Sequence, residues 1–84
     1  MKDASITLDN TPPVHAGDTV TFTTEGPKQA VVNVVAYRDG LGIVSAETKA
    51  QDESFVVPSC DWVHAHLVTK GSHAPLASVS FEVA

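Results

Sequence analysis

Short apolar runs separated by turn-forming residues constrain this chain more than any other feature. The runs are rich in Val, Thr, Phe and other residues that suit a pleated, half-buried surface, and several alternate apolar with polar positions. All five prolines stand at the borders of the runs, where a missing backbone donor does not interrupt a ladder. The pattern predicts an all-β sandwich or small barrel of seven strands, at residues 4–8, 19–23, 30–38, 41–46, 54–57, 62–69 and 76–83.

The most apolar run, 30–38, is typical of a central strand. Strand alternation places Val32, Val34 and Ala36 on one face, and Val31, Asn33, Val35 and Tyr37 on the other. Asp39-Gly40 follows, which predicts a two-residue type I′ hairpin leading into 41–46. The polar segment 47–53 has almost no apolar residue to bury, so we expect it to be a connection or a ragged edge.

The last two runs also alternate. In 62–69 the inward positions are Val63, Ala65 and Leu67, and the outward positions are Trp62, His64, His66 and Val68. In 76–83 the better inward set is Ala77, Val79, Phe81 and Val83. Three aromatic or imidazole side chains are therefore expected on one outward face.

Length and charge limit the function classes. Residues 1–84 suffice for one domain, and a hydrophobic fraction of 43% argues against disorder. The net charge of −5 and the scattered basic residues make nucleic acid and membranes unexpected partners. Cys60 is the only cysteine, so no disulfide can form within the chain. We expect neither a secretory leader nor a transmembrane segment, and we expect synthesis in a reducing cytoplasm.

His64 and His66 form the sharpest local motif. Two residues apart on a strand, they project from one face at a distance that allows a shared metal ion, which Asp61, His15 or His73 could complete. The alternative is that both are contact-face residues alternating with core positions. A stable zinc site needs three or four ligands, so we expect no metal and no cofactor.

Cys60 is considered as a nucleophile because histidines are near it in sequence. A catalytic thiol needs a base and an electropositive pocket, whereas Asp61 next to it raises the thiol pKa. We interpret Cys60 as a packing residue and expect no catalytic residue and no enzyme activity. Trp62 is either a recognition anchor or a cover for an open edge of the sandwich.

Several segments resemble the immunoglobulin-like β-sandwich domains of tailed-phage virion proteins. The first two strands of bacterial and phage immunoglobulin-like domains resemble the opening of this chain, Ile6-Thr7-Leu8, Pro13-Val14 and Ala16-Gly17-Asp18-Thr19-Val20-Thr21-Phe22. The tailed-phage proteins resemble it in the centre and at the end, Val34-Val35-Ala36-Tyr37-Arg38-Asp39-Gly40 and Ser78-Val79-Ser80-Phe81-Glu82-Val83. The chain departs from antibody domains, because Phe22 stands where a disulfide cysteine would be and Trp62 opens a late strand.

The resemblance implies an immunoglobulin-like, seven-stranded antiparallel β-sandwich without a disulfide. It also implies a non-catalytic decoration protein on a virion surface, made in the host cytoplasm, whose partners are viral capsid or tail proteins. The candidate contact residues are Trp62, His64, His66 and His73. The alternative is a carbohydrate-binding or adhesion module of a larger secreted bacterial protein, with a host cell-surface glycan as ligand. A metal-dependent enzyme is a third hypothesis, which predicts bound zinc.

Overall fold

The computed structural model describes residues 4–49, 54–69, 71 and 74–84, and these form an all-β architecture. Eight strands are present in the described part. No helix occurs there, and so none that could cross a membrane. In chain order the strands are β1 (Ser5–Leu8), β2 (Thr19–Val20), β3 (Phe22–Glu25), β4 (Ala30–Arg38), β5 (Leu41–Lys49), β6 (Phe55–Val56), β7 (Trp62–Thr69) and β8 (Ala77–Glu82).

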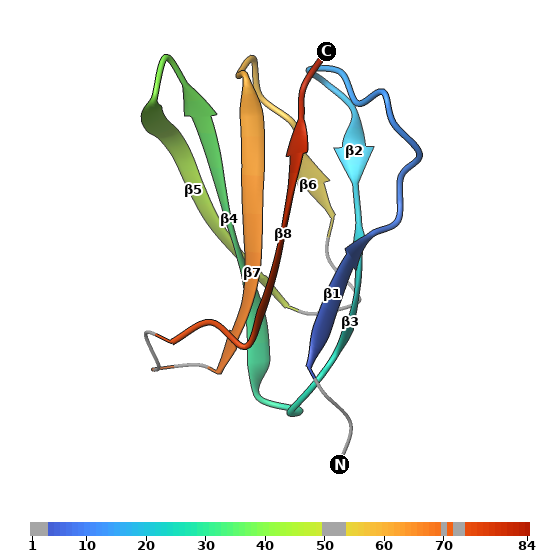
Figure 1. Cartoon of the computed structure of the whole chain (residues 1–84), viewed down its shortest axis with the longest axis vertical. Coiled ribbons are helices and arrows are strands. Elements are labelled where there is room, and N and C mark those ends of the chain that lie inside the picture. The colour runs from blue at the N-terminus through green and yellow to red at the C-terminus, as the bar shows by residue number, and fades with distance from the viewer. Residues whose placement is uncertain (1–3, 50–53, 70, 72–73) are drawn as a thin grey trace.

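The strands make antiparallel sheets that face each other across an apolar core, as in a β-sandwich (Figure 1). One layer is a four-stranded sheet in the order β5-β4-β7-β8. The other consists of the pairs β1-β3 and β2-β6. A cis peptide bond between Pro12 and Pro13 lies between β1 and Val14, which bridges in parallel to Val83 beyond β8.

The run expected as one strand at 19–23 is divided at Thr21 into β2 and β3. The two pieces have different partners, because β2 pairs with β6 and β3 pairs with β1. At the break, hydrogen bonds from side chains replace part of the backbone pairing. Asn10 Nδ2 donates to the Thr19 carbonyl at 3.0 Å, and Asn10 Oδ1 accepts from the Thr21 N–H at 3.2 Å. Asp9 accepts hydrogen bonds from the hydroxyls of Thr21 and Thr23.

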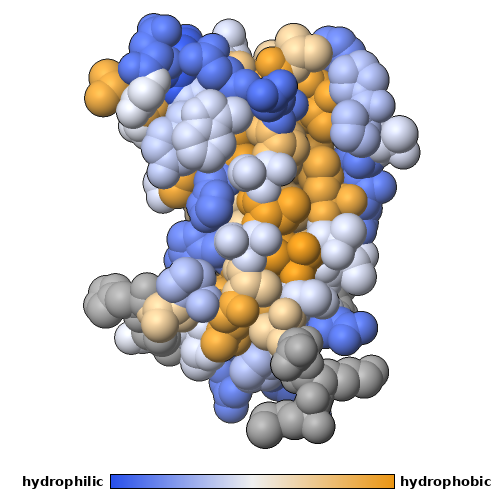
Figure 2. Space-filling model, viewed as in Figure 1, coloured by the Kyte–Doolittle hydropathy of each residue, from blue (hydrophilic) through white to orange (hydrophobic). Residues whose placement is uncertain are grey.

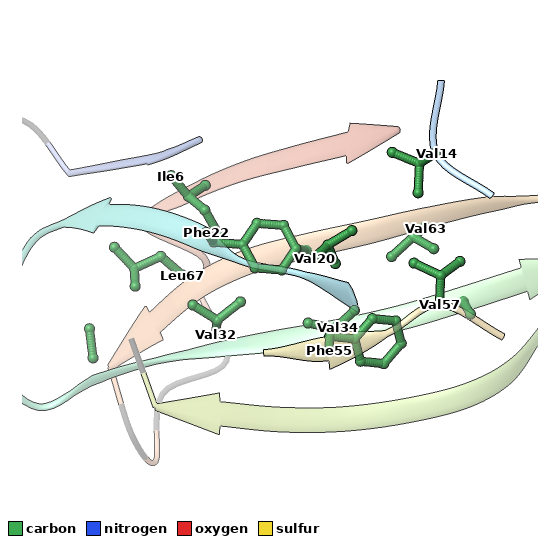
Figure 3. Close-up of a cluster of buried hydrophobic side chains, with 13 residues drawn as sticks. Ile6, Val14, Val20, Phe22, Val32, Val34, Phe55, Val57, Val63 and Leu67 are labelled. Carbon is green, nitrogen blue, oxygen red and sulfur yellow. The ribbon is translucent and has the colours of Figure 1, made fainter. Parts of the chain in front are cut away.

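The core is built from alternate residues of facing strands (Figure 3). On β4 the buried and half-buried positions alternate without exception from Ala30 to Tyr37, which confirms the two predicted faces. The largest fully buried side chains come from both layers, and they are Leu67, Val20, Val32, Val34, Val57 and Val63. Phe22 meets Phe81 across the layers, with ring centroids 6.4 Å apart.

The hairpin between β4 and β5 confirms the predicted Asp39-Gly40 turn. Arg38 pairs with Leu41, and both turn residues have positive φ, 54° for Asp39 and 80° for Gly40. The end predicted for the following strand is wrong, because β5 continues to Lys49. Thr48 is buried opposite Val32, so the β4 ladder extends the strand through a polar stretch. The rest of the expected connection, 50–53, lies outside the described residues.

The apolar side chains of β8 are less buried than those of the central strands. Ala77, Val79 and Phe81 face the core, as predicted, but remain half-buried. In Figure 2 an apolar band runs down this side of the molecule, over the position that β8 has in Figure 1. Val68 of β7, predicted to point outward, lies outside the core cluster but is only 4% exposed next to its partner Val31.

Candidate functional site

The outer face of the four-stranded sheet carries a row of aromatic and imidazole rings. Trp62, His64 and His66 project from β7 on this face, because they alternate with the buried Val63, Ala65 and Leu67. Tyr37 is directly opposite Trp62 on β4, and Asn33 is opposite His66. We call Asn33, Tyr37, Trp62, His64 and His66 the outer-face row.

Tyr37 and Trp62 form the aromatic end of the row. Their ring centroids are 4.2 Å apart and their planes differ by 10°, so the rings are stacked. Directly opposite residues of an antiparallel pair have close Cβ atoms on the same face, which brings the two large rings together. The Trp62 side of the pair remains accessible, since Trp62 is 38% exposed. The stack therefore combines a fixed orientation with a surface that another molecule can reach.

Backbone hydrogen bonds hold the start of β7 in place behind this stack. The Asp61 N–H donates to the Tyr37 carbonyl at 2.8 Å, and the Asp61 carbonyl accepts from the Val83 N–H at 2.9 Å. The Asp61 carboxylate accepts from the Asp39 N–H at 2.9 Å, which ties the β4–β5 turn to the same point. Strand β7 therefore begins, at Trp62, directly after a residue that is hydrogen-bonded to β4, to the β4–β5 turn and to the residue that follows β8.

The imidazoles continue the row along β7. The Trp62 and His64 ring centroids are 6.4 Å apart in an edge-on arrangement, and those of His64 and His66 are 5.7 Å apart. Asn33 Nδ2 lies 3.5 Å from His66 Nε2. Burial, and then the charge of neighbouring His64, lower the pKa of His66 below its ordinary value. The His66 ring is therefore predominantly neutral at physiological pH.

Strand β8 supplies a polar border to the row. Ser78, Ser80 and Glu82 are the β8 partners of His66, His64 and Trp62, and all three are exposed. An open hollow of about 500 Å³ lies next to the indole ring, and its lining is Asp61, Trp62, Ser80, Phe81, Glu82 and Val83. This border adds hydroxyl and carboxylate groups next to the rings of the row.

Cys60 lies outside the row. It is half-buried and packs against the core, in keeping with its interpretation as a packing residue. Burial is the main cause that raises its thiol pKa, and Asp61 raises it further, while Arg38 acts in the opposite direction. A raised pKa leaves little thiolate, the nucleophilic form.

The structure brings together three of the four sequence-predicted contact residues, Trp62, His64 and His66. The fourth, His73, lies outside the described residues. His15, considered above as a third metal ligand, instead lies 3.9 Å from the Asp18 carboxylate in the loop before β2. Within the described ranges, no group of three or more His, Cys, Asp or Glu is placed to hold a metal ion.

Tyr37 and Asn33 belong to the row but were not among the predicted contact residues. Strand alternation already put both on one face of 30–38. Their proximity to Trp62 and His66 depends on the register between β4 and β7, for which the sequence has no local signal. In comparisons with protein-family models, curated proteins and solved structures, this chain matched none.

Proposed function

We propose that this chain is a non-catalytic structural accessory protein of a bacteriophage particle, an immunoglobulin-like module that docks on capsid or tail subunits through the outer-face row. The observation that carries the docking surface is the exposed stack of Trp62 on Tyr37, continued by His64 and His66. Tryptophan and tyrosine are enriched among the residues that dominate protein interfaces. The particle as the place of docking rests on the sequence resemblance.

The strand order supports the immunoglobulin-like part of the proposal. When β2 and β3 are counted as one interrupted strand, the described part has seven strands. The first, second and fifth then form one layer, and the third, fourth, sixth and seventh form the other. Such sandwiches have two antiparallel sheets whose strands are exchanged through Greek-key connections. Since Cys60 is the only cysteine, this sandwich would be held by core packing without an intrachain disulfide.

A pelleting experiment tests the docking. The purified chain is mixed with phage particles assembled without it, and the bound fraction is measured against chain concentration. We expect saturable binding that Trp62→Ser weakens at least about tenfold, the effect of a hot-spot residue. The matched control is Val56→Ser, which removes an apolar side chain that is 62% exposed on the other layer. Absence of saturable binding, or equal loss in both variants, contradicts the proposal.

A carbohydrate-binding or adhesion module is the second candidate. The hollow beside Trp62 favours it, because an indole ring bordered by Ser80, Asp61 and Glu82 offers both stacking and hydrogen bonds to a sugar. The stacking of Tyr37 on Trp62 counts against it, since each ring covers part of the other. A glycan array probed with the chain distinguishes the two candidates: sugar binding lost in Trp62→Ser, without particle binding, supports the second.

A further inference from the structure

The two histidines of the outer-face row are close to the geometry of a shared metal ion. Their ring centroids are 5.7 Å apart and the ring planes differ by 46°. Two imidazoles bound to one ion at metal–nitrogen distances of about 2.0–2.1 Å have centroids roughly 5 Å apart. A small side-chain rotation would close the difference, because both residues leave the same face of one rigid central strand.

The surroundings of the pair favour a cation. The cross-strand neighbours of His66 are Asn33 and Ser78, and those of His64 are Val35 and Ser80, so no positive side chain occupies these positions. Asn33 lies within 3.5 Å of one nitrogen of the His66 ring. Asn33 approaches with an amide N–H donor, so this contact falls on the acceptor nitrogen Nε2; at 3.5 Å it is long, and a metal ion that takes the same lone pair displaces it. The chain as a whole is also anionic, with a net charge of −5.

We propose that His64 and His66 form a two-imidazole site for a divalent transition-metal ion, of the nitrogen-preferring class Cu²⁺, Ni²⁺ and Zn²⁺. The pair supplies two ligands on the exposed side of the sheet, and water completes the coordination sphere in the isolated chain. Such a site differs from a closed structural zinc site, which takes four protein ligands. The inference concerns the isolated chain and does not depend on docking to a particle.

The only tryptophan of the chain provides a reporter for this site. The Trp62 ring is 6.4 Å from the His64 ring, so a paramagnetic Cu²⁺ ion held by His64 quenches its fluorescence. We expect titration of the purified chain with Cu²⁺ at neutral pH to give saturable quenching with one ion per chain. EDTA should reverse it, and Zn²⁺, which does not quench tryptophan in this way, should compete with it.

Three single variants identify the ligands. His64→Gln and His66→Gln should each weaken the apparent affinity at least about tenfold, because the loss of even an outer-shell partner weakens metal sites by that much. The control is His15→Gln, in the loop before β2 and next to Asp18, and its affinity should equal that of the wild type. Circular dichroism of each variant verifies that the fold is retained.

A second measurement needs no variant. Addition of Zn²⁺ to the ¹⁵N-labelled wild-type chain should shift the imidazole signals of His64 and His66 and leave those of His15 in place. The proposal is overturned if Cu²⁺ at concentrations up to about 1 mM, the range of weak millimolar binding, gives no saturable quenching. It is also overturned if His15→Gln abolishes quenching, or if Zn²⁺ moves neither signal.

Discussion

The indole ring of Trp62 lies parallel to the phenol ring of Tyr37, with centroids 4.2 Å apart, across the central strand pair of the four-stranded sheet. This stack joins an aromatic pair from β4 and β7 to the two imidazoles that follow on β7. The outer face of the sheet therefore carries a continuous row of rings from Tyr37 to His66.

The stack should contribute to stability as a coupled pair. We expect a double-mutant cycle with Tyr37→Leu and Trp62→Leu, measured by urea unfolding, to give a coupling free energy of about 0.5–1.5 kcal/mol. Leucine retains apolar area at both positions, so the coupling reports the ring contact. A control cycle of Trp62→Leu with Val56→Ser, which lies on the other layer, should be additive. Strict additivity in the first cycle would show that the rings do not interact in solution.

Adjacent residues of β4 should differ sharply in their contribution to the core. Val34 has no exposed surface, whereas Val35 is half-buried on the outer face. We expect Val34→Ala to lower the free energy of unfolding by about 2–3 kcal/mol, and Val35→Ala by less than about 1 kcal/mol. The same atoms are deleted in both variants, so the difference between the two losses in free energy of unfolding reports which face of β4 each side chain occupies. Equal losses would be incompatible with the inward and outward assignment of β4.

Asn10 should stabilise the break between β2 and β3. Its side chain donates to the Thr19 carbonyl and accepts from the Thr21 N–H. Asn10→Ala removes both bonds, and we expect it to lower the free energy of unfolding by about 1–2 kcal/mol. The neighbouring exposed residue Thr11 provides the control, since Thr11→Ala should change stability by less than about 0.5 kcal/mol. The idea fails if thermal and urea unfolding rank the two variants as equal.

Gly40 should be required for backbone conformation alone. Its φ is +80°, and no described atom lies within 4 Å of the position of an added Cβ. Gly40→Ala should therefore cost about 1–2 kcal/mol through the left-handed conformation, without a steric clash. Asp39→Asn should be nearly neutral, because asparagine also tolerates positive φ. A neutral Gly40→Ala in urea unfolding would show that the turn has another conformation in solution.

The lowered pKa of His66 gives stability a defined pH dependence. The folded chain disfavours protonated His66, mainly through burial and then through His64. The unfolded chain therefore binds this proton more readily. The contribution of His66 to the free energy of unfolding should be fully present above the ordinary histidine pKa of 6.5. It should be lost as the pH is lowered through that value toward the lower pKa that His66 has in the folded chain.

Urea unfolding in EDTA at about pH 7.5 and about pH 5.5 measures this loss for the wild type and for His66→Gln. The variant should lose less stability than the wild type. The other residues on this part of the face are Asn33, Val35, Ser78 and Ser80, with Glu47 one strand further away on β5. Glu47→Gln therefore serves as the charge control. An unchanged loss in His66→Gln would show that other groups govern the acid response.

Much of the fold could be predicted from the sequence, because burial imposes alternation residue by residue. The two faces of β4, the inward set of β8 and the Asp39-Gly40 turn are all local consequences of side-chain type. The break at Thr21 could not be predicted in this way. It arises because β3 pairs with β1 whereas β2 pairs with β6. The extension of β5 past Ala46 likewise depends on the β4 ladder, because its own residues there are polar.

The candidate site, like the fold, could be predicted from the sequence only in part. Period-two spacing was enough to put Trp62, His64 and His66 on one face of 62–69. Tyr37 and Asn33 join them only through the pairing of β4 with β7, which places Tyr37 opposite Trp62 and Asn33 opposite His66. A register shift of one residue would have turned Tyr37 to the other face. The stack is thus a product of tertiary pairing.

The most direct test of the docking surface uses the chain with 5-fluorotryptophan at Trp62, which gives one ¹⁹F signal because the sequence has a single tryptophan. Phage particles assembled without the chain are added, and pelleting is measured on the same samples. If the outer-face row is the docking surface, the ¹⁹F chemical shift of the bound chain, measured on the pellet by magic-angle spinning, differs from that of the free chain. Binding that leaves the signal of the bound chain unchanged would contradict it.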